Sequence, residues 1–565
     1  MKYKNVKIFI PIMCFALAIS MFSCVNDLNV TPIDPSVTQT FNQDQVFTKI
    51  YSSLALTGQT APQGDADVKG VDEGFSAFFR SIWNANELTT DEALWAWNDP
   101  GIPELQYNSW SSANLLLKGL YGRLYFNITL CNLFIAQTDG LTDVKTVKQR
   151  AETRFMRAMN YAYLLDMFGN VPFTEVVTLT ASAKQIQRAD LFTYINRELA
   201  ACETDMYQIG ETKPYYRVNV VANWLLRSRL YLNAEVYTGT AKWDSAAIYA
   251  AKVLGPVAGS PATGYSLCPT FRQLFMGDNA GALDGSTVNQ APNEIIFPIA
   301  QDGLRTQNWG GSEFLIAAIR SADMPSGGIA ASWSCARARS TLVKKFFPTG
   351  STFFKDNNDL TTAIISSLKD NRALLLKGGV VIKKKDGTDS INTVQRTLII
   401  TTNTFTQGYS VIKFSNLRAD GKAASSTDWP DMDVPFMRLA EAYLTYTEAV
   451  TRGAAVIGGY TAQQAFNALR TRAGAVTLTG VPTLQNIIDE WSREFFFEGR
   501  RRMDLIRFGQ FGGTNTYNWD WKNNLAPDFA TGTPPVSQFS ADLNIFPIPS
   551  TDMNANANLT QNHGY

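Results

Sequence analysis

Apolar residues recur at helical spacing in several separate stretches of the chain. One such stretch is residues 150–168, RAETRFMRAMNYAYLLDMF. Its apolar stripe consists of Phe155, Ala158, Met159, Ala162, Leu165 and Phe168. Spacings of three and four residues are typical of a helix with one face in the core. The pair Gly169-Asn170 and then Pro172 predict that this helix ends there.

Three further regions predict helices that are joined in pairs by short turns. Residues 218–237 and 244–254 flank the turn GTAKW, and similar pairs fit at 435–473 and at 484–509. Such pairs resemble tetratricopeptide repeats, although no clean period of about 34 residues is present. Because stacked amphipathic pairs bury a continuous core, the pattern predicts a mainly α fold. Its tetratricopeptide-like scaffold would span about 150–255 and 435–510.

The pattern changes between about 256 and 430, where glycine, proline, asparagine and serine are frequent. Strand-like pieces occur at Glu294–Ala300, Gly379–Lys385 and Thr397–Thr402, and Lys385–Thr388 has the composition of a hairpin turn. We therefore expect a loop-rich insertion with short strands. Together with residues 60–115 it would carry the ligand site, within a single domain of residues 48–565.

The first residues have the features of an export signal. Lys2, Lys4 and Lys7 precede an apolar run from Ile8 to Phe22, and Ser23 and Cys24 follow it. A cysteine at this point indicates a lipoprotein signal of residues 1–23, with Cys24 acylated and residues 24–47 as a polar tether. An ordinary secreted protein with a chance cysteine is the alternative. A lipid anchor needs no membrane-spanning helix.

Composition excludes several function classes. Lys plus Arg and Asp plus Glu number 50 each, so the charge balance gives no reason to expect a nucleic-acid partner. The single histidine, His563, lies near the end, which removes serine–histidine and cysteine–histidine catalysis and histidine-based zinc sites. Paired-carboxylate glycosidases remain open. Cys131, Cys202, Cys268 and Cys335 follow no metal-binding spacing, and we expect buried thiols, with a disulfide left open.

Tryptophans mark the candidate binding residues. The stretch from Trp83 to Trp110 contains four of the twelve, and Trp95 and Trp97 would share one face of an extended segment. Trp309 and Trp333 lie alone in the loop-rich part, and two glycines follow Trp309. Core packing and a binding platform are both open for these rings. Trp83 and Trp110 are interpreted as core anchors.

Two segments near the end of the chain have distinctive compositions. EWSREFFFEGRRRMDLIRF places Glu494 and Glu498 four residues apart, followed by Arg500, Arg501 and Arg502. This density favours a structural ion-pair network over catalysis, with the arginines at a helix C-terminus, where cations are favoured. The last residues, IFPIPSTDMNANANLTQNHGY, predict an extended segment laid over the fold.

These motifs together resemble the SusD/RagB family of outer-membrane nutrient-binding lipoproteins. The matching stretches are RAETRFMRAMNYAYLLDMFGNVPF, MRLAEAYLTYTEA with LRTRAG, EWSREFFFEGRRRMDLIRFG and FPIPSTDMNANANLTQNHGY. The resemblance implies a protein that is lipid-anchored on the outer membrane, faces the exterior and performs no chemistry. It also implies a TonB-dependent transporter as partner.

A narrower resemblance, to starch-binding members of the family, rests on VNDLNVTPIDP, NELTTDEALWAW, PIAQDGLRTQNWGGSEF and DMPSGGIAASWSC. It implies binding of starch or maltooligosaccharides by an arc of aromatic rings. The implied contact residues are Trp95, Trp97, Trp309 and Trp333, with polar contacts from Asp72 and Arg80 and from Asn98 or Asp99. Trp95 is the expected leading contact. A calcium site would fall near Asp278–Asn293, where no EF-hand spacing occurs. A different glycan, or glycoside hydrolysis, is the alternative function.

Overall fold

The structure is a computed structural model that describes most of the chain. The described residues are 41–59, 62, 66–177, 182–281, 288–321, 324–346, 370–376, 381–383, 389–391, 410–517 and 539–565. The chain divides into two units, Met1–Val46 and Phe47–Tyr565. The predicted signal peptide and Cys24 lie outside the described residues. Helix α2 (Gln43–Ala55) already begins within the predicted tether.

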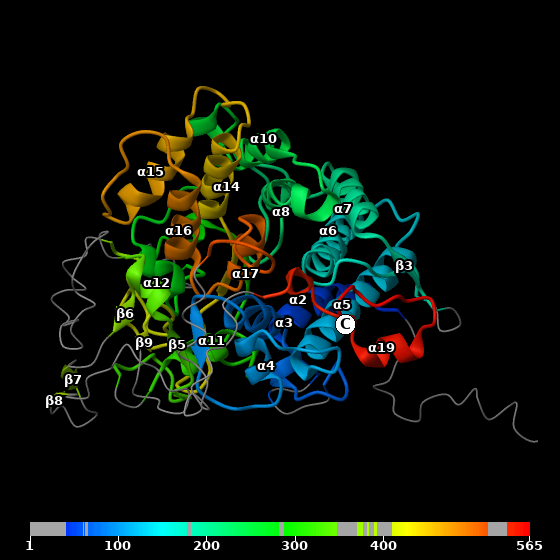
Figure 1. Cartoon of the computed structure of the whole chain (residues 1–565), viewed down its shortest axis with the longest axis horizontal. Helices are drawn as coiled ribbons and strands as arrows, with labels where there is room; N and C mark the ends of the chain where they lie inside the picture. Colours follow the sequence, from blue (N-terminus) through cyan, green and yellow to red (C-terminus); the bar gives the residue numbers. More distant parts are fainter. Residues whose placement is uncertain are drawn as a thin grey trace, which may run out of the picture. The chain divides into compact units, whose positions relative to one another are not determined.

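The predicted helical scaffold is confirmed. Its long helices are α5 (Leu115–Gln137), α6 (Val144–Met167), α7 (Arg188–Cys202), α8 (Val220–Leu232), α10 (Trp243–Leu254), α14 (Leu439–Thr451), α15 (Ala462–Arg472) and α16 (Leu484–Phe495). From α5 to α10 each helix packs on the next, and α10 packs on α14 although the insertion separates them in sequence. Helices α15 and α16 both pack on α14. Figure 1 shows the series running from α6 and α7 through α8 and α10 to α14, α15 and α16. No helix in the described part of the chain is long and apolar enough to cross a membrane.

Local sequence signals set the ends of these helices. The Asn114 side chain accepts hydrogen bonds from the N–H groups of Leu116 and Leu117 at the start of α5. Thr461 and Thr483 form capping boxes at the starts of α15 and α16. The predicted stop after α6 is confirmed, because Gly169 has a φ of 68° that favours glycine.

The charged segment near residue 494 is a structural network, as predicted. Arg438 Nη1 donates to Glu494 at 2.6 Å, and Arg372 Nη1 donates to Glu494 at 2.9 Å and to Glu490 at 2.7 Å. The predicted placement of Arg500–Arg502 at a helix C-terminus is wrong. Helix α16 ends at Phe495, and Arg501 begins the next helix, α17 (Arg501–Arg507), after a bend with positive φ at Phe497 and Gly499.

Short antiparallel strands connect the loop-rich parts to the scaffold. Strand β4 (Ile295–Ile299), which confirms one predicted strand, pairs with β10 (Val434–Arg438) just before α14. Strands β7 (Val381–Lys383) and β8 (Asp389–Ile391) pair antiparallel on either side of the predicted hairpin turn. Strand β2 (Val171–Phe173) pairs with β3 (Lys184–Ile186), and β6 (Leu375–Leu376) pairs with β9 (Ser410–Val411). The predicted strand at 397–402 lies outside the described residues.

One pairing joins the two halves of the loop-rich part. Strand β1 (Ala93–Trp95) pairs antiparallel with β5 (Ala336–Ala338), with Trp95 opposite Ala336. Helix α4 (Ile102–Tyr107) packs on β1 and α11 (Ser312–Ile319) packs on β5, while α12 (Ser340–Lys344) follows β5. Helix α3 (Phe78–Trp83) lies beside α4 in Figure 1. Residues near position 95 and near position 333 are thereby held side by side.

The last residues lie across the scaffold, as expected. Asn562 Nδ2 donates to the carbonyl groups of Phe168 and Phe546, and Gln185 exchanges hydrogen bonds with the backbone of Thr560. The segment is less extended than predicted, because it contains the short helix α19 (Ser550–Ala555), drawn in red below β3 in Figure 1.

Candidate functional site

Three half-buried tryptophans and one phenylalanine form a surface next to the β1–β5 pair. We call Phe75, Trp97, Trp309 and Trp333 the aromatic surface. The strand pairing continues past β1, where Ala96 N–H donates to the Cys335 carbonyl at 2.9 Å. This brings the Trp97 and Trp333 rings together, with centroids 6.2 Å apart and planes tilted by 33°. Since all four rings are partly exposed, a ligand can contact them.

Trp309 is held by a close approach of two backbones. It lies just before α11, and Gly310 packs so tightly on Ala77 that a Cβ at Gly310 would overlap the Ala77 Cβ. Ala77 is the residue that precedes α3. The Trp309 ring is therefore fixed relative to the first turn of α3, which carries Arg80.

Arg80 lies at the centre of the aromatic surface. Its guanidinium carbon is 4.8 Å from the Phe75 ring centroid, 5.1 Å from that of Phe314 and 5.6 Å from that of Trp333. Its Nη1 atom donates to the Trp309 carbonyl at 3.1 Å. Burial lowers the pKa of Arg80, while Cys335, Asp72 and Asp99 act electrostatically to raise it. The guanidinium thus links the loops that carry the rings.

The predicted role of Trp95 as the leading contact is wrong. Its side chain is 0 % exposed. The ring stacks on Phe314, with centroids 5.7 Å apart and planes 19° apart, and meets the edges of Trp83 and Trp97. A ring with no free face cannot stack on a ligand. Trp95 instead packs against Trp97, and Trp97 is the partly exposed ring of the two.

The predicted polar residues lie around the same place. Asp72 is exposed, and its Oδ1 atom accepts from the Gly74 N–H at 3.0 Å. Asn98 is exposed and Asp99 is half-buried in the loop that follows Trp97. Because Asp72 and Asp99 both act on Arg80 electrostatically, the structure places these two carboxylates near Arg80.

Sequence reasoning missed Phe75, Phe314 and Glu313. Phe75 and Phe314 contact Arg80, and Glu313 is a buried acid in the otherwise apolar helix α11, SEFLIAAI. An isolated acid in an apolar run is a signal that could have identified Glu313. Nothing in the local pattern distinguishes the two phenylalanines from core residues.

Two further predictions are confirmed: Trp83 and Trp110 are buried in the core, and the cysteines are buried thiols. Trp83 Nε1 donates to the Phe497 carbonyl, and Trp110 Nε1 donates to the Tyr565 hydroxyl. The four cysteines of the described chain are buried and free.

The described residues of the stretch expected to hold calcium form no assembled ligand set. The Asp278 carboxylate is buried and accepts from the N–H groups of Ala419 and Asp420 and from Asn289 Nδ2. Within the described ranges, no group of three or more acidic, histidine or cysteine side chains could hold a metal ion. Residues 282–287 lie outside those ranges.

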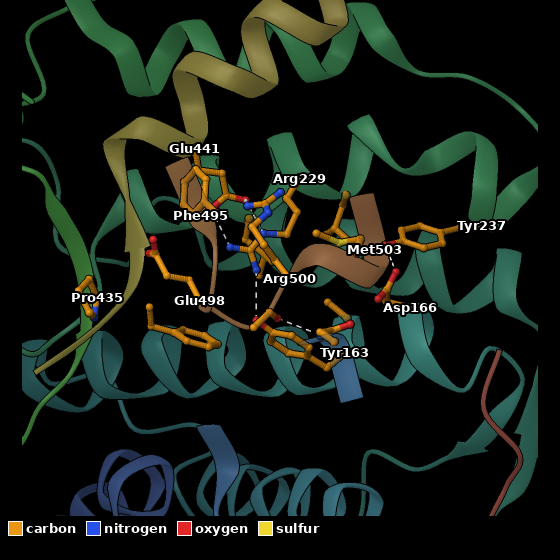
Figure 2. A pocket seen from close by; sticks show the side chains of 16 residues that line it. Tyr163, Asp166, Arg229, Tyr237, Pro435, Glu441, Phe495, Glu498, Arg500 and Met503 are labelled. Carbon is orange, nitrogen blue, oxygen red and sulfur yellow. Dashed lines mark hydrogen bonds and ion pairs between the residues drawn. The ribbon is translucent and has the colours of Figure 1, made fainter. Parts of the chain in front are cut away.

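A cavity lies inside the helical scaffold and is shown in Figure 2. Its acids are already paired. Both Glu441 oxygens accept from Arg229, at 2.6 and 2.7 Å, and the Tyr237 hydroxyl donates to Asp166 at 2.9 Å. Although burial alone would raise the pKa of Glu441, Arg229 and Arg500 lower it below its usual value. A glycosidase acid needs a raised pKa, so Glu441 is unsuited to that role.

This cavity is also too small to hold a sugar polymer. Its volume is about 50 Å³, which is room for roughly three to five water molecules. The aromatic surface, whose residues are partly exposed, is the candidate site for a large ligand.

The chain is similar to proteins of one family. A sequence model described as the SusD family matches residues 344–565. The starch-binding protein SusD of Bacteroides thetaiotaomicron is 41 % identical over 590 aligned residues, which cover all of both chains.

Solved structures share the fold. A SusD-like carbohydrate-binding protein from Bacteroides fragilis gives a TM-score of 0.67 at 17 % identity, over 92 % of this chain and 98 % of that one. Surface glycan-binding protein A from Bacteroides thetaiotaomicron, in complex with laminarihexaose, gives 0.62 at 17 % identity, over 92 % and 98 % of the two chains.

Proposed function

The chain belongs to the SusD family, and from this membership and the aromatic surface we propose that it binds starch and maltooligosaccharides without cleaving them. The relative named for starch binding is similar over its whole length. The aromatic surface supplies the physical means of holding such a ligand.

The tilted pair of Trp97 and Trp333 carries this proposal. A pyranose ring has an apolar face of C–H groups that an aromatic ring can cover, and polar groups fix its hydroxyls. Two sugars stacked on planes inclined by 33° would be inclined to each other, as in the wound chain of an α-1,4-glucan. A flat β-1,4-glucan has no such turn between successive contacts. Trp309, whose carbonyl accepts from Arg80, would supply a third ring near this pair.

The place of the protein in the cell follows from its first residues and its family. We infer that Cys24 is acylated and anchors the chain to the outer membrane, facing the exterior. The bound glucan would then pass to a TonB-dependent transporter. A platform open to solvent binds each sugar weakly, and a polymer with many repeats gains avidity.

Titration calorimetry with several glycans tests the proposal. We expect heat with maltoheptaose and little with cellohexaose, and about a tenfold loss of affinity in Trp333→Ala, because a buried aromatic contact is worth about 1–3 kcal/mol. Trp243→Ala, on the scaffold helix α10, is the matched control and should bind as the unchanged protein does.

Three results would contradict the proposal. The first is tighter binding of laminarihexaose or another glycan than of maltoheptaose. The second is the appearance of shorter sugars after incubation, which would favour a glycosidase. The third is unchanged affinity in Trp333→Ala.

A further inference from the structure

One loop packs against both segments of the insertion that carry the exposed tryptophans. It consists of residues 425–431, SSTDWPD, and we call it the 425–431 loop. The Thr427 carbonyl in this loop accepts from the N–H group of Ala330 at 2.8 Å, just before Trp333. Trp429 follows two positions after Thr427. The loop that contains Trp429 therefore lies beside the segment of Trp333.

The 425–431 loop also holds the turn that precedes Trp309. Gly303 N–H donates to Asp431 Oδ1 at 2.9 Å. Gly303 lies so close to Trp429 that an added Cβ would be 2.5 Å from the Trp429 carbonyl oxygen. Within the loop, the other Asp431 oxygen accepts from the Ser425 N–H at 2.7 Å. Trp429 is thus part of a fixed loop that contacts both ring-bearing segments.

The side chain of Trp429 is half-buried and unpartnered. No described residue accepts its indole N–H, and its ring contacts no other described aromatic ring or cation. By contrast, the indole N–H groups of Trp83, Trp110 and Trp491 donate to acceptors inside the protein. An accessible indole offers a ligand an apolar face and a hydrogen-bond donor.

Trp429 shares its state with the tryptophans of the aromatic surface. Trp97, Trp309 and Trp333 are also half-buried residues of loops, and no described residue accepts their indole N–H groups. Trp243 is half-buried too, but it lies on the scaffold helix α10 with the guanidinium carbon of Arg452 over its ring, 5.8 Å from the centroid. In exposure and location, Trp429 therefore resembles the tryptophans of the candidate site.

We propose that Trp429 forms an outer subsite of the glycan-binding surface, where it stacks on a sugar ring of a long α-glucan chain. This inference rests on the proposed function, since it needs an α-glucan on the aromatic surface. The indole covers the C–H face of the sugar, and its N–H donates to a hydroxyl oxygen. The carboxylate of Asp428, the preceding residue, is exposed and accepts from another hydroxyl group.

The position of this subsite makes its contribution depend on chain length. The Trp97 and Trp333 rings contact each other, but Trp429 contacts neither ring. The path from Trp333 to Trp429 runs through three residues to Ala330, across one hydrogen bond to Thr427 and on through two residues. At no more than about 3.6 Å per residue, this path is at most roughly 25 Å long. A short sugar on the Trp97–Trp333 pair therefore leaves Trp429 empty, and a longer chain reaches it.

Titration calorimetry with maltotriose and maltoheptaose tests the subsite. We expect Trp429→Ala to bind maltoheptaose at least about threefold more weakly than the unchanged protein and to bind maltotriose within about twofold of it. Trp429→Phe keeps an aromatic face and should retain most of the affinity for maltoheptaose. Trp243→Ala, which removes a half-buried tryptophan from α10, is the matched control and should change neither affinity.

The outcomes separate this subsite from the proposed function. Full affinity of Trp429→Ala for maltoheptaose would overturn the subsite while starch binding stands. An equal loss for both sugars would also overturn it, because the substitution would then act by displacing Trp309 or Trp333. If the unchanged protein binds no α-glucan, the proposed function itself fails. Should Trp429→Ala not fold, Trp429→Leu decides, since leucine keeps apolar bulk and has no flat ring.

Discussion

At the scale of single residues, the candidate binding rings could be identified from the sequence. Which of these rings are exposed could not be predicted. Trp95 and Trp97 are two positions apart, and the structure indeed puts their rings in contact. What covers Trp95 is Phe314, which comes from a helix far along the chain. No local pattern contains that contact. The same reason hid Phe314, which lies under Arg80 of α3.

We therefore predict different effects on stability and binding for mutations of Trp95 and Trp97. We expect Trp95→Ala to lower the free energy of unfolding by about 3–5 kcal/mol, because it removes a fully buried large ring and leaves a cavity. Urea unfolding followed by circular dichroism measures this loss. Trp97→Ala is the matched control, and its half-exposed ring should cost less stability while weakening maltoheptaose binding. A stable Trp95→Ala protein that no longer binds would restore Trp95 as a contact residue.

At the scale of elements, helices were predictable and the short strands that organise the site were not. Helix α6 shows its core face and its stop within its own residues. Strands β1 and β5 have three residues each, and their pairing depends on partners distant in sequence. The ion-pair network was foreseeable from its charge density. Its partners Arg372 and Arg438, on other elements, were not.

The contact between the Trp309 loop and α3 can be tested by a substitution and its rescue. We expect Gly310→Ala to weaken maltoheptaose binding, because the added Cβ overlaps Ala77 and must push Trp309 away from Arg80. The double variant Gly310→Ala with Ala77→Gly removes the clash and should recover most of the affinity. Calorimetry on the three proteins measures this. Equal affinity in all of them would mean that the loop does not position Trp309.

The ion pairs of α16 predict that the protein becomes less stable in acid. Burial would raise the pKa of Glu490, but Arg372, Arg493 and Arg470 outweigh it and lower the pKa to about 2. Since the pKa in the folded protein is below the unfolded value of about 4.3, this group stabilises the fold above that value. The contribution is lost as pH falls through about 2.

Urea unfolding of Glu490→Gln between pH 2.5 and pH 7 checks this prediction. At pH 7 the variant should lose roughly 3–5 kcal/mol, because it leaves buried arginines with one partner fewer. Its stability should then depend less on pH than that of the unchanged protein. Glu235→Gln, exposed on α9 (Ala234–Thr238), should change neither quantity. Parallel pH profiles for Glu490→Gln and the unchanged protein would contradict the assignment.

At the scale of the whole molecule, the helical scaffold supports the aromatic surface, but the residues of that surface come from segments outside the scaffold. The chain leaves the scaffold after α10 and returns through β10 into α14, and β4 pairs with β10 at the return. The insertion contributes Trp309 and Trp333, while Asp72, Arg80 and Trp97 precede the scaffold. Repeating helical periodicity made the scaffold predictable. The meeting of the two remote parts depends on the β1–β5 pair and on the contacts of Arg80.

Co-crystallisation of the protein with maltoheptaose tests directly whether the aromatic surface binds starch. We expect density for an uncleaved, curved glucan with sugar rings against Trp97, Trp309 and Trp333, and with hydroxyl groups toward Arg80. Density at another place, or density for a shortened sugar, would contradict it.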